Sequence, residues 1–278
     1  MAIPALQALD QALAAAVQAV ASSVVHVARG HGGGTGIAWS ADLVISSSYH
    51  TPDRTRVDED REAEVIGRDP GTDVAVLRVN GGGLTPAKFR ELGDLGVGNL
   101  ALAIGRPGRT ARASLRAIGV LGPEIKTPWG GRLDRYVESD RQIPRGFAGG
   151  PLVDAEGAVI GMNTRTLLRG ADLAVPTSTL RRVVDELVQH GGIRRGYLGV
   201  GAYPTPNGAL VSSVEDGSPA GVAGVIAGDI IVELGGAAVS DPDSLRAAIA
   251  DRPGETLDLV FLRGGAKQQL SVTLGSKA

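Results

Sequence analysis

The heptapeptide Gly146-Phe147-Ala148-Gly149-Gly150-Pro151-Leu152 constrains the fold of this chain more than any other segment. Its glycines allow a tight turn, and the apolar residue after the proline can enter a strand. Such a turn brings two backbone N–H groups together beside its central residue, where they can bind a negatively charged oxygen. Ala148 occupies that centre. It keeps the N–H group but has no side-chain oxygen.

Two acid–base residues precede this loop. His50 ends a β-rich run over residues 44–50, and Asp73 leads into another over residues 74–79. The order histidine, aspartate, nucleophile loop is that of chymotrypsin-like proteases, whereas subtilisins and α/β-hydrolases use other orders. The chain therefore resembles the HtrA/Deg proteases, in which a chymotrypsin-like domain is followed by a PDZ domain.

The resemblance extends over nearly the whole chain. The matching segments are residues 33–37, 73–79, 97–107, 140–148, 159–164 and 195–200, with the PDZ-like pattern over 217–231. The chain departs from the family pattern at Ser48-Tyr49, just before His50, and at Pro144-Arg145, just before Gly146.

The resemblance implies a mainly β fold, a chymotrypsin-like double β-barrel followed by a small α/β PDZ domain. We expect an N-terminal amphipathic helix over residues 1–22, a protease domain over 23–177, a connecting helix over 178–192 and a PDZ domain over 193–278. Apolar residues on one helical face support the first helix. Ser178 is placed to begin the connecting helix and Gly191 to end it. The charge-dense residues 53–64 predict a solvated loop.

The catalytic roles follow from the resemblance. His50 would be the general base and Asp73 the residue that orients it, with Ala148 at the nucleophile position. The oxyanion would be bound by the N–H groups of Gly146 and Ala148. The alternative interpretation is a histidine in a surface turn and an aspartate that merely starts a strand.

The family fold also implies a primary specificity pocket. Its walls would be formed by Gln142, Ile143, Asn163, Thr164 and Leu173. Residues 141–147 and 161–167 contain no Asp or Glu, so we expect the pocket to take a small or medium apolar side chain. The alternative interpretation, equally consistent with the sequence, is that Ile143 and Leu173 are ordinary core residues.

In the PDZ-like region, one loop resembles the family's binding site for a peptide carboxylate, and the peptide would add as a strand to the sheet edge. The predicted peptide-binding residues are Tyr197, Leu198, Gly199, Val200, Leu245 and Ile249. The last two lie one helical turn apart, and the sequence allows them to face either the groove or the core.

Composition limits the other classes of function. The chain has no cysteine, and its four histidines form no recognisable metal-binding motif, so we expect no metal and no cofactor. A formal net charge of −2 gives no reason to expect nucleic-acid binding. Asp10 argues against a membrane span in the first apolar segment.

The expected compartment depends on the true N-terminus. No Lys or Arg precedes Arg29, which argues against a signal peptide. We expect a cytoplasmic protein if Met1 is the native start, and an extracytoplasmic one if a signal or anchor has been lost. The family resemblance also implies a possible homotrimer.

Two functions remain open at this point. The first is a serine endopeptidase acting on unfolded or misfolded proteins, inactivated here by alanine at position 148. The second is a natural pseudoprotease, a peptide-binding or scaffolding protein that would use its cleft and its PDZ groove without catalysis. Retention of His50 and Asp73 favours the first function, and the unusual residues beside His50 and Gly146 favour the second.

Overall fold

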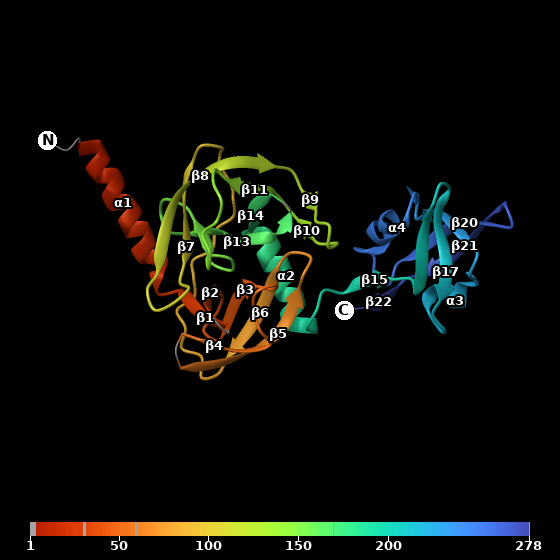
Figure 1. The fold of residues 1–278 in the computed structure, drawn as a ribbon, viewed down its shortest axis with the longest axis horizontal. Helices are drawn as coiled ribbons and strands as arrows, with labels where there is room; N and C mark the ends of the chain where they lie inside the picture. Colours follow the sequence, from red (N-terminus) through yellow and green to blue (C-terminus); the bar gives the residue numbers. More distant parts are fainter. Residues whose placement is uncertain (1–3, 30–31, 59, 169, 278) are drawn as a thin grey trace. The chain divides into compact units, whose positions relative to one another are not determined.

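The computed structural model describes residues 4–29, 32–58, 60–168 and 170–277. The chain divides into two compact units, Met1–Ile193 and Arg194–Ala278. In Figure 1 the first unit runs from red to green and the second from teal to blue. Each unit has its own hydrophobic core, so each is described by itself.

The first barrel of the first unit is a closed antiparallel sheet with the strand order β1-β2-β3-β6-β5-β4. Its strands are β1 (Val24–Arg29), β2 (Gly32–Ala38), β3 (Leu43–Ser47), β4 (Arg54–Val57), β5 (Arg61–Asp69) and β6 (Val74–Val79). The prediction of a loop over residues 53–64 was wrong, because β4 and β5 form a hairpin there. Glu62 and Glu64 are exposed and Ala63 between them is buried, so the charges occupy one face of a strand.

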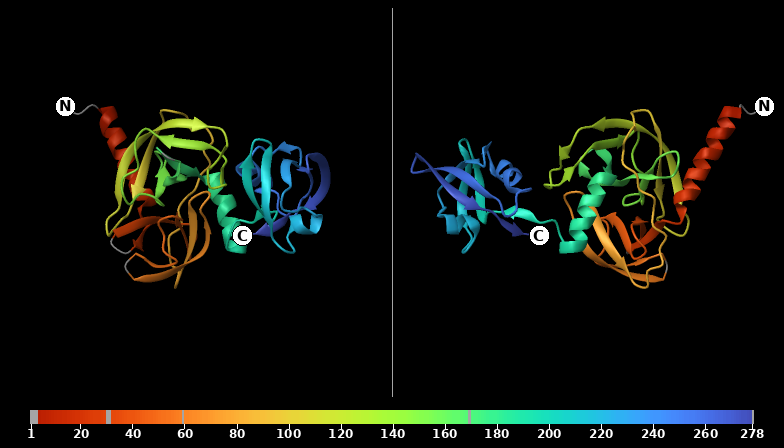
Figure 2. Two further views of the ribbon diagram at one scale, coloured as in Figure 1. Left: turned by 45° about the vertical axis from the view of Figure 1, so that its right-hand side comes forward. Right: turned by 180° about the vertical axis from the view of Figure 1, so that it is seen from behind.

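The second barrel is also closed and has the order β11-β14-β13-β12-β7-β8. Its strands are β7 (Leu100–Gly105), β8 (Arg112–Gly122), β11 (Tyr136–Ser139), β12 (Pro151–Val153), β13 (Val159–Leu168) and β14 (Ala171–Pro176), and a separate hairpin joins β9 (Ile125–Lys126) to β10 (Arg132–Leu133). Figure 2 shows the red and orange strands of the first barrel and the yellow and green strands of the second in separate halves of this unit.

Two helices complete the first unit. Helix α1 (Pro4–Ala21) packs through its C-terminal half, where Ala16 and Val20 are buried, whereas Leu6 and Leu9 near its start are exposed. Helix α2 (Thr177–His190) contacts strands of both barrels.

The two ends of α2 differ in how well the sequence predicts them. Gly191 is left-handed, with φ 72°, and its N–H donates to the carbonyl of Leu187 at 2.9 Å, as expected for a C-cap. The expected cap by Ser178 is absent. Pro176 is the N-cap instead, without a side-chain cap bond, and the Thr177 hydroxyl donates to the Val159 carbonyl at 3.1 Å.

The second unit is built on one antiparallel sheet with the order β16-β17-β18-β20-β21, to which β19 adds through β18. Its elements are β15 (Arg195–Tyr197), β16 (Val200–Thr205), β17 (Gly208–Val214), α3 (Pro219–Ala223), β18 (Ile230–Leu234), β19 (Ala237–Ala238), α4 (Pro242–Ile249), β20 (Thr256–Arg263), β21 (Ala266–Thr273) and β22 (Gly275–Lys277). Helix α4 begins with a capping box between Asp241 and Ser244. Strand β16 lies at an edge of the sheet, so one of its sides is open to a further strand.

Candidate active site and peptide groove

Asp73 is the most firmly held residue of the candidate active site. It lies in the turn just before β6 in a left-handed conformation, with φ 58°, and its side chain is buried. Its carboxylate accepts hydrogen bonds from the Ser47 hydroxyl at 2.9 Å, the Tyr49 N–H at 3.0 Å and the Thr164 hydroxyl at 2.6 Å. Thr164 belongs to β13 of the second barrel, so this carboxylate ties the two barrels together.

His50 lies in the turn after β3 and is half-buried. Its backbone N–H donates to the Ser47 carbonyl at 3.3 Å, and its ring meets that of Tyr49 edge-on at 5.0 Å between centroids. Among the described residues the His50 imidazole has no hydrogen-bond partner. It therefore makes no hydrogen bond to Asp73. Burial lowers the pKa of His50 below its usual value, and the positive charges of Arg29 and Arg165 lower it further, against the opposing effect of Asp73.

The conformation of the loop around Ala148 is fixed by two left-handed glycines and by hydrogen bonds of its backbone. Gly146 and Gly149 have φ 84° and 86°, and a Cβ at Gly149 would collide with the Thr35 carbonyl. The Thr35 hydroxyl donates to the Gly146 carbonyl at 2.6 Å. The Gly149 N–H donates to the Asn163 carbonyl at 2.8 Å. These contacts fix the loop between β13 and the first barrel.

Two donors of this loop are left unused. In the part of the chain that the structure describes, neither the Gly146 N–H nor the Ala148 N–H donates a hydrogen bond. His50, Gly146 and Ala148 line one cavity of about 750 Å³. The structure therefore brings the predicted base, the nucleophile position and the two predicted oxyanion donors to one place, with Asp73 buried close to them.

The residues expected to form the specificity pocket lie elsewhere. None of the five lines the cavity beside Ala148. Gln142 is exposed, and Ile143 and Leu173 are buried in two core clusters. The Asn163 side chain donates to the Gly150 and Pro151 carbonyls at 3.0 and 2.8 Å, and the Thr164 hydroxyl is engaged by Asp73. Both polar residues thus hold the loop and the carboxylate, and a share in a specificity pocket stays a prediction for this set.

Sequence reasoning missed a carboxylate in this region. Asp172 of β14 accepts a hydrogen bond from the Ile143 N–H at 2.6 Å and pairs with the Arg165 guanidinium at 3.4 Å. It lies one residue before Leu173, outside the two windows searched for acidic residues. The period-two alternation of a strand could have pointed to it, because Asp172 and Leu173 face opposite sides.

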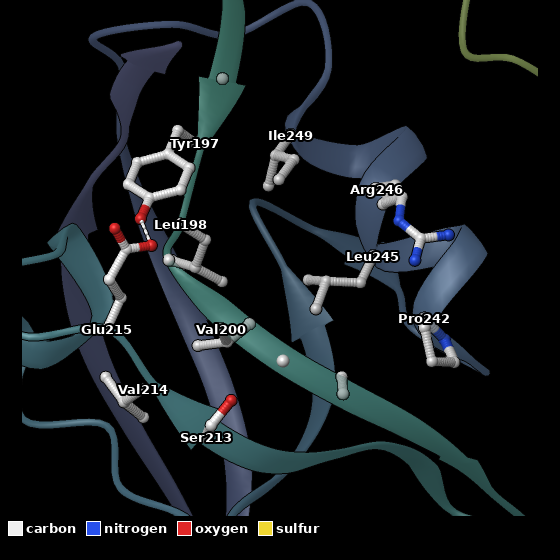
Figure 3. Close-up of a pocket in the computed structure, with 14 residues that line it drawn as sticks. Tyr197, Leu198, Val200, Ser213, Val214, Glu215, Pro242, Leu245, Arg246 and Ile249 are labelled. Atoms are coloured by element: carbon white, nitrogen blue, oxygen red, sulfur yellow. Dashed lines mark hydrogen bonds between the residues drawn. The ribbon is translucent and has the colours of Figure 1, made fainter.

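A second hollow lies in the other unit, between the open edge of β16 and helix α4. Its volume is about 520 Å³, and all six residues predicted to bind a peptide line it. Figure 3 shows Leu245 and Ile249 of α4 on one side and Val200 of β16 on the other. Leu245 also belongs to the hydrophobic core, so the groove and core interpretations both hold for it.

The loop at the end of this groove offers backbone donors. Gly199 is left-handed, with φ 79°, and a Cβ there would collide with Ser218. Within the described residues the N–H groups of Leu198 and Gly199 donate no hydrogen bond. The Tyr197 hydroxyl donates to the Glu215 carboxylate beside the loop, which raises the pKa of Tyr197 (Figure 3).

The described ranges contain no group of three or more side chains suited to hold a metal ion. Among the helices of those ranges, none combines the length and the apolar character that a membrane crossing requires.

Comparison with known proteins matches each of the two units to a domain family. Residues 34–162 match the family of trypsin-like peptidase domains, and residues 196–274 match the PDZ domain family. A probable periplasmic serine endoprotease, DegP-like, from Brucella suis is 32% identical over 240 residues, which cover 77% of this chain and 45% of the relative. The periplasmic pH-dependent serine endoprotease DegQ of Escherichia coli is 33% identical over 236 residues, which cover 77% of this chain and 51% of the relative. The chain thus spans about half the length of these curated relatives.

Solved structures agree with these matches. The HtrA-type protease AlgW with a bound decapeptide superposes with a TM-score of 0.72 at 25% identity, covering 96% of this chain and 99% of that one. A serine endoprotease from Yersinia pestis superposes with a TM-score of 0.72 at 26% identity, covering 96% of this chain and 98% of that one. With the two closed barrels and the domain matches, the predicted fold class is confirmed.

Proposed function

The chain has the trypsin-like peptidase domain and the PDZ domain of HtrA/DegP-type proteases, and from this we propose that it is a serine endopeptidase of unfolded or misfolded proteins, in a form that Ala148 inactivates. The observation that carries the proposal is the shared cavity of His50, Gly146 and Ala148, in which two backbone donors stand unused.

The chemistry needs one atom that alanine lacks. A serine hydroxyl at position 148 would attack the peptide carbonyl while His50 takes its proton and later returns it to the leaving amine. The Gly146 and Ala148 N–H groups would hold the oxyanion. Asp73 would stabilise the imidazolium once the His50 ring turns towards it.

The direct test is Ala148→Ser on casein as an unfolded substrate. A nucleophilic serine is worth about 10⁶ in kcat in a comparable protease, so proteolysis should rise far above an almost absent background. The double variant Ala148→Ser/His50→Ala should return to background. Ala148→Ser protein that stays inert on unfolded substrates, with and without PDZ ligands, would contradict the proposal.

One observation favours the pseudoprotease alternative. In the described residues the His50 imidazole makes no hydrogen bond to Asp73, whose carboxylate is already bonded to Ser47, Tyr49 and Thr164. A protein released from catalysis has no need for that bond. Inert Ala148→Ser protein that still binds peptides would establish this alternative.

For the PDZ unit we propose binding of peptides that end in an apolar residue and a free carboxylate. The unused amides of Leu198 and Gly199, the apolar sides of Leu245 and Ile249 and the open edge of β16 support this. Isothermal titration should give binding of free-acid peptides and at least tenfold weaker binding of their amidated twins, since a charged hydrogen bond contributes about 1.5–3 kcal/mol. Equal affinities would rule out capture of the carboxylate.

We also propose an extracytoplasmic location and a homotrimer. The relatives from Brucella suis and Escherichia coli are named as periplasmic. The exposed Leu6 and Leu9 of α1 give an apolar surface that self-association would cover. Fractionation of the source cells tests the proposed location. Analytical ultracentrifugation that shows a monomer at micromolar protein concentration would refute the trimer.

A further inference from the structure

The cavity beside Ala148 is lined by basic side chains. Four arginines contribute to it, namely Arg29, Arg112, Arg145 and Arg165. None of its described lining residues is an Asp or Glu. The chain as a whole carries a formal net charge of −2, so this concentration of positive charge is local.

Arg29 is the most unusual of the four. Its Nε and Nη2 atoms are buried and have no hydrogen-bond partner among the described residues. Burial lowers the pKa of its guanidinium, and only the charge of Asp73 opposes this effect. A partly buried guanidinium with two unsatisfied nitrogens is costly, and the charge of an anion in the cavity would offset part of that cost.

Two of the other arginines have no internal counter-ion. Arg112 and Arg145 are exposed, and no carboxylate oxygen of the described residues lies within 4.0 Å of their guanidinium nitrogens. Arg165 differs, because Asp172 pairs with it at 3.4 Å. Three of the four arginines around the cavity therefore make no ion pair with a carboxylate of the described residues.

We propose that this cleft selects extended peptide segments that carry Asp or Glu side chains next to the residue presented to position 148. The inference rests on the proposed peptide-binding role of the cleft and adds the class of peptide that it prefers. The unused N–H groups of Gly146 and Ala148 suit a peptide carbonyl, and the flanking guanidinium groups suit carboxylates at neighbouring positions.

The binding test uses this chain with Ala148 in place. Labelled peptides of equal length share one apolar centre and carry Glu, Gln or Lys on both sides of it, and their C-termini are amidated to weaken binding at the PDZ groove. Fluorescence anisotropy at low ionic strength should give a Kd for the Glu peptide roughly tenfold below that of the Gln peptide. The Lys peptide should bind most weakly. The difference should shrink in about 1 M salt, where the Debye length is about 3 Å.

Charge reversal locates the effect. Arg112→Glu/Arg145→Glu changes two exposed residues without internal ion pairs, so the fold should be retained. This variant should lose the preference for Glu or prefer Lys. The control Lys88→Glu/Lys126→Glu introduces the same charge change at two exposed lysines that do not line the cavity, and it should keep the preference.

The outcomes separate this inference from the proposed protease activity. If Ala148→Ser cuts casein but binding of Glu and Gln peptides is equal, the charge selection is wrong and the activity stands. If the Glu preference is present and Ala148→Ser is inert, the selection stands without the activity. A preference that survives in Arg112→Glu/Arg145→Glu, or an oligonucleotide that competes as well as the Glu peptide, would overturn the inference.

Discussion

Asp73 illustrates how single residues build the candidate site. A buried carboxylate in a left-handed turn is costly unless donors surround it, and Ser47, Tyr49 and Thr164 supply them. His50, Asp73 and Ala148 could be selected from the sequence because each lies in a short motif and the three motifs follow the chymotrypsin order along the chain. Arg29 and Asp172 could not, because their contribution depends on which strands face the cavity.

Thr164→Val should destabilise the first unit. The substitution keeps the shape of the side chain and removes the 2.6 Å bond to a buried carboxylate, which should cost about 1–3 kcal/mol of unfolding free energy. Urea denaturation measures the change. Thr164→Ser keeps the hydroxyl and should lose clearly less, so equal losses in the two variants would contradict this role.

The pH dependence follows from His50. Its pKa is lowered, so the neutral form that can accept a proton persists at more acidic pH than in an unperturbed imidazole of about 6.5. In an active Ala148→Ser protein, kcat/KM should therefore rise with pH through a midpoint below that value. Arg29→Gln removes a nearby positive charge, so it should raise the pKa and move the midpoint to higher pH. NMR titration of the His50 ring in the Ala148 protein gives the same test without catalysis.

At the scale of elements, α1 has a packed half and an exposed half. Val20→Ala removes buried methyl groups and should cost roughly 2 kcal/mol of unfolding free energy. Leu6→Ala removes a side chain that is 62% exposed and should change stability by less than about 0.5 kcal/mol in the monomer. Denaturant unfolding at low protein concentration compares the pair, and similar losses would mean that α1 packs along its whole length.

The elements also mark where sequence patterns fail. The connecting helix, expected over residues 178–192 and observed as α2 (Thr177–His190), was predictable because its apolar period is strong and Gly191 ends it. The β4–β5 hairpin was missed because the outward face of a barrel strand takes charges as readily as a loop does. Binary patterning over so few residues does not separate these two cases.

At the scale of the whole molecule, two separately packed units predict two unfolding events. Calorimetry with an excess of an apolar C-terminal peptide should raise only the transition of the second unit. At a free peptide concentration of about 100 Kd the gain in its unfolding free energy should be about 2.7 kcal/mol. A single transition that moves as one would show that the units unfold together.

The bond between Asp73 and Thr164 also dictates when the site can exist during synthesis. Its partners lie 91 residues apart, one just before β6 of the first barrel and the other on β13 of the second. A ribosome adding about 5–20 residues per second needs roughly 5–18 seconds to make the intervening chain. Throughout that interval a nascent chain could close its first barrel without assembling the candidate site. A chain built in this way completes its candidate site only after both barrels have been synthesised.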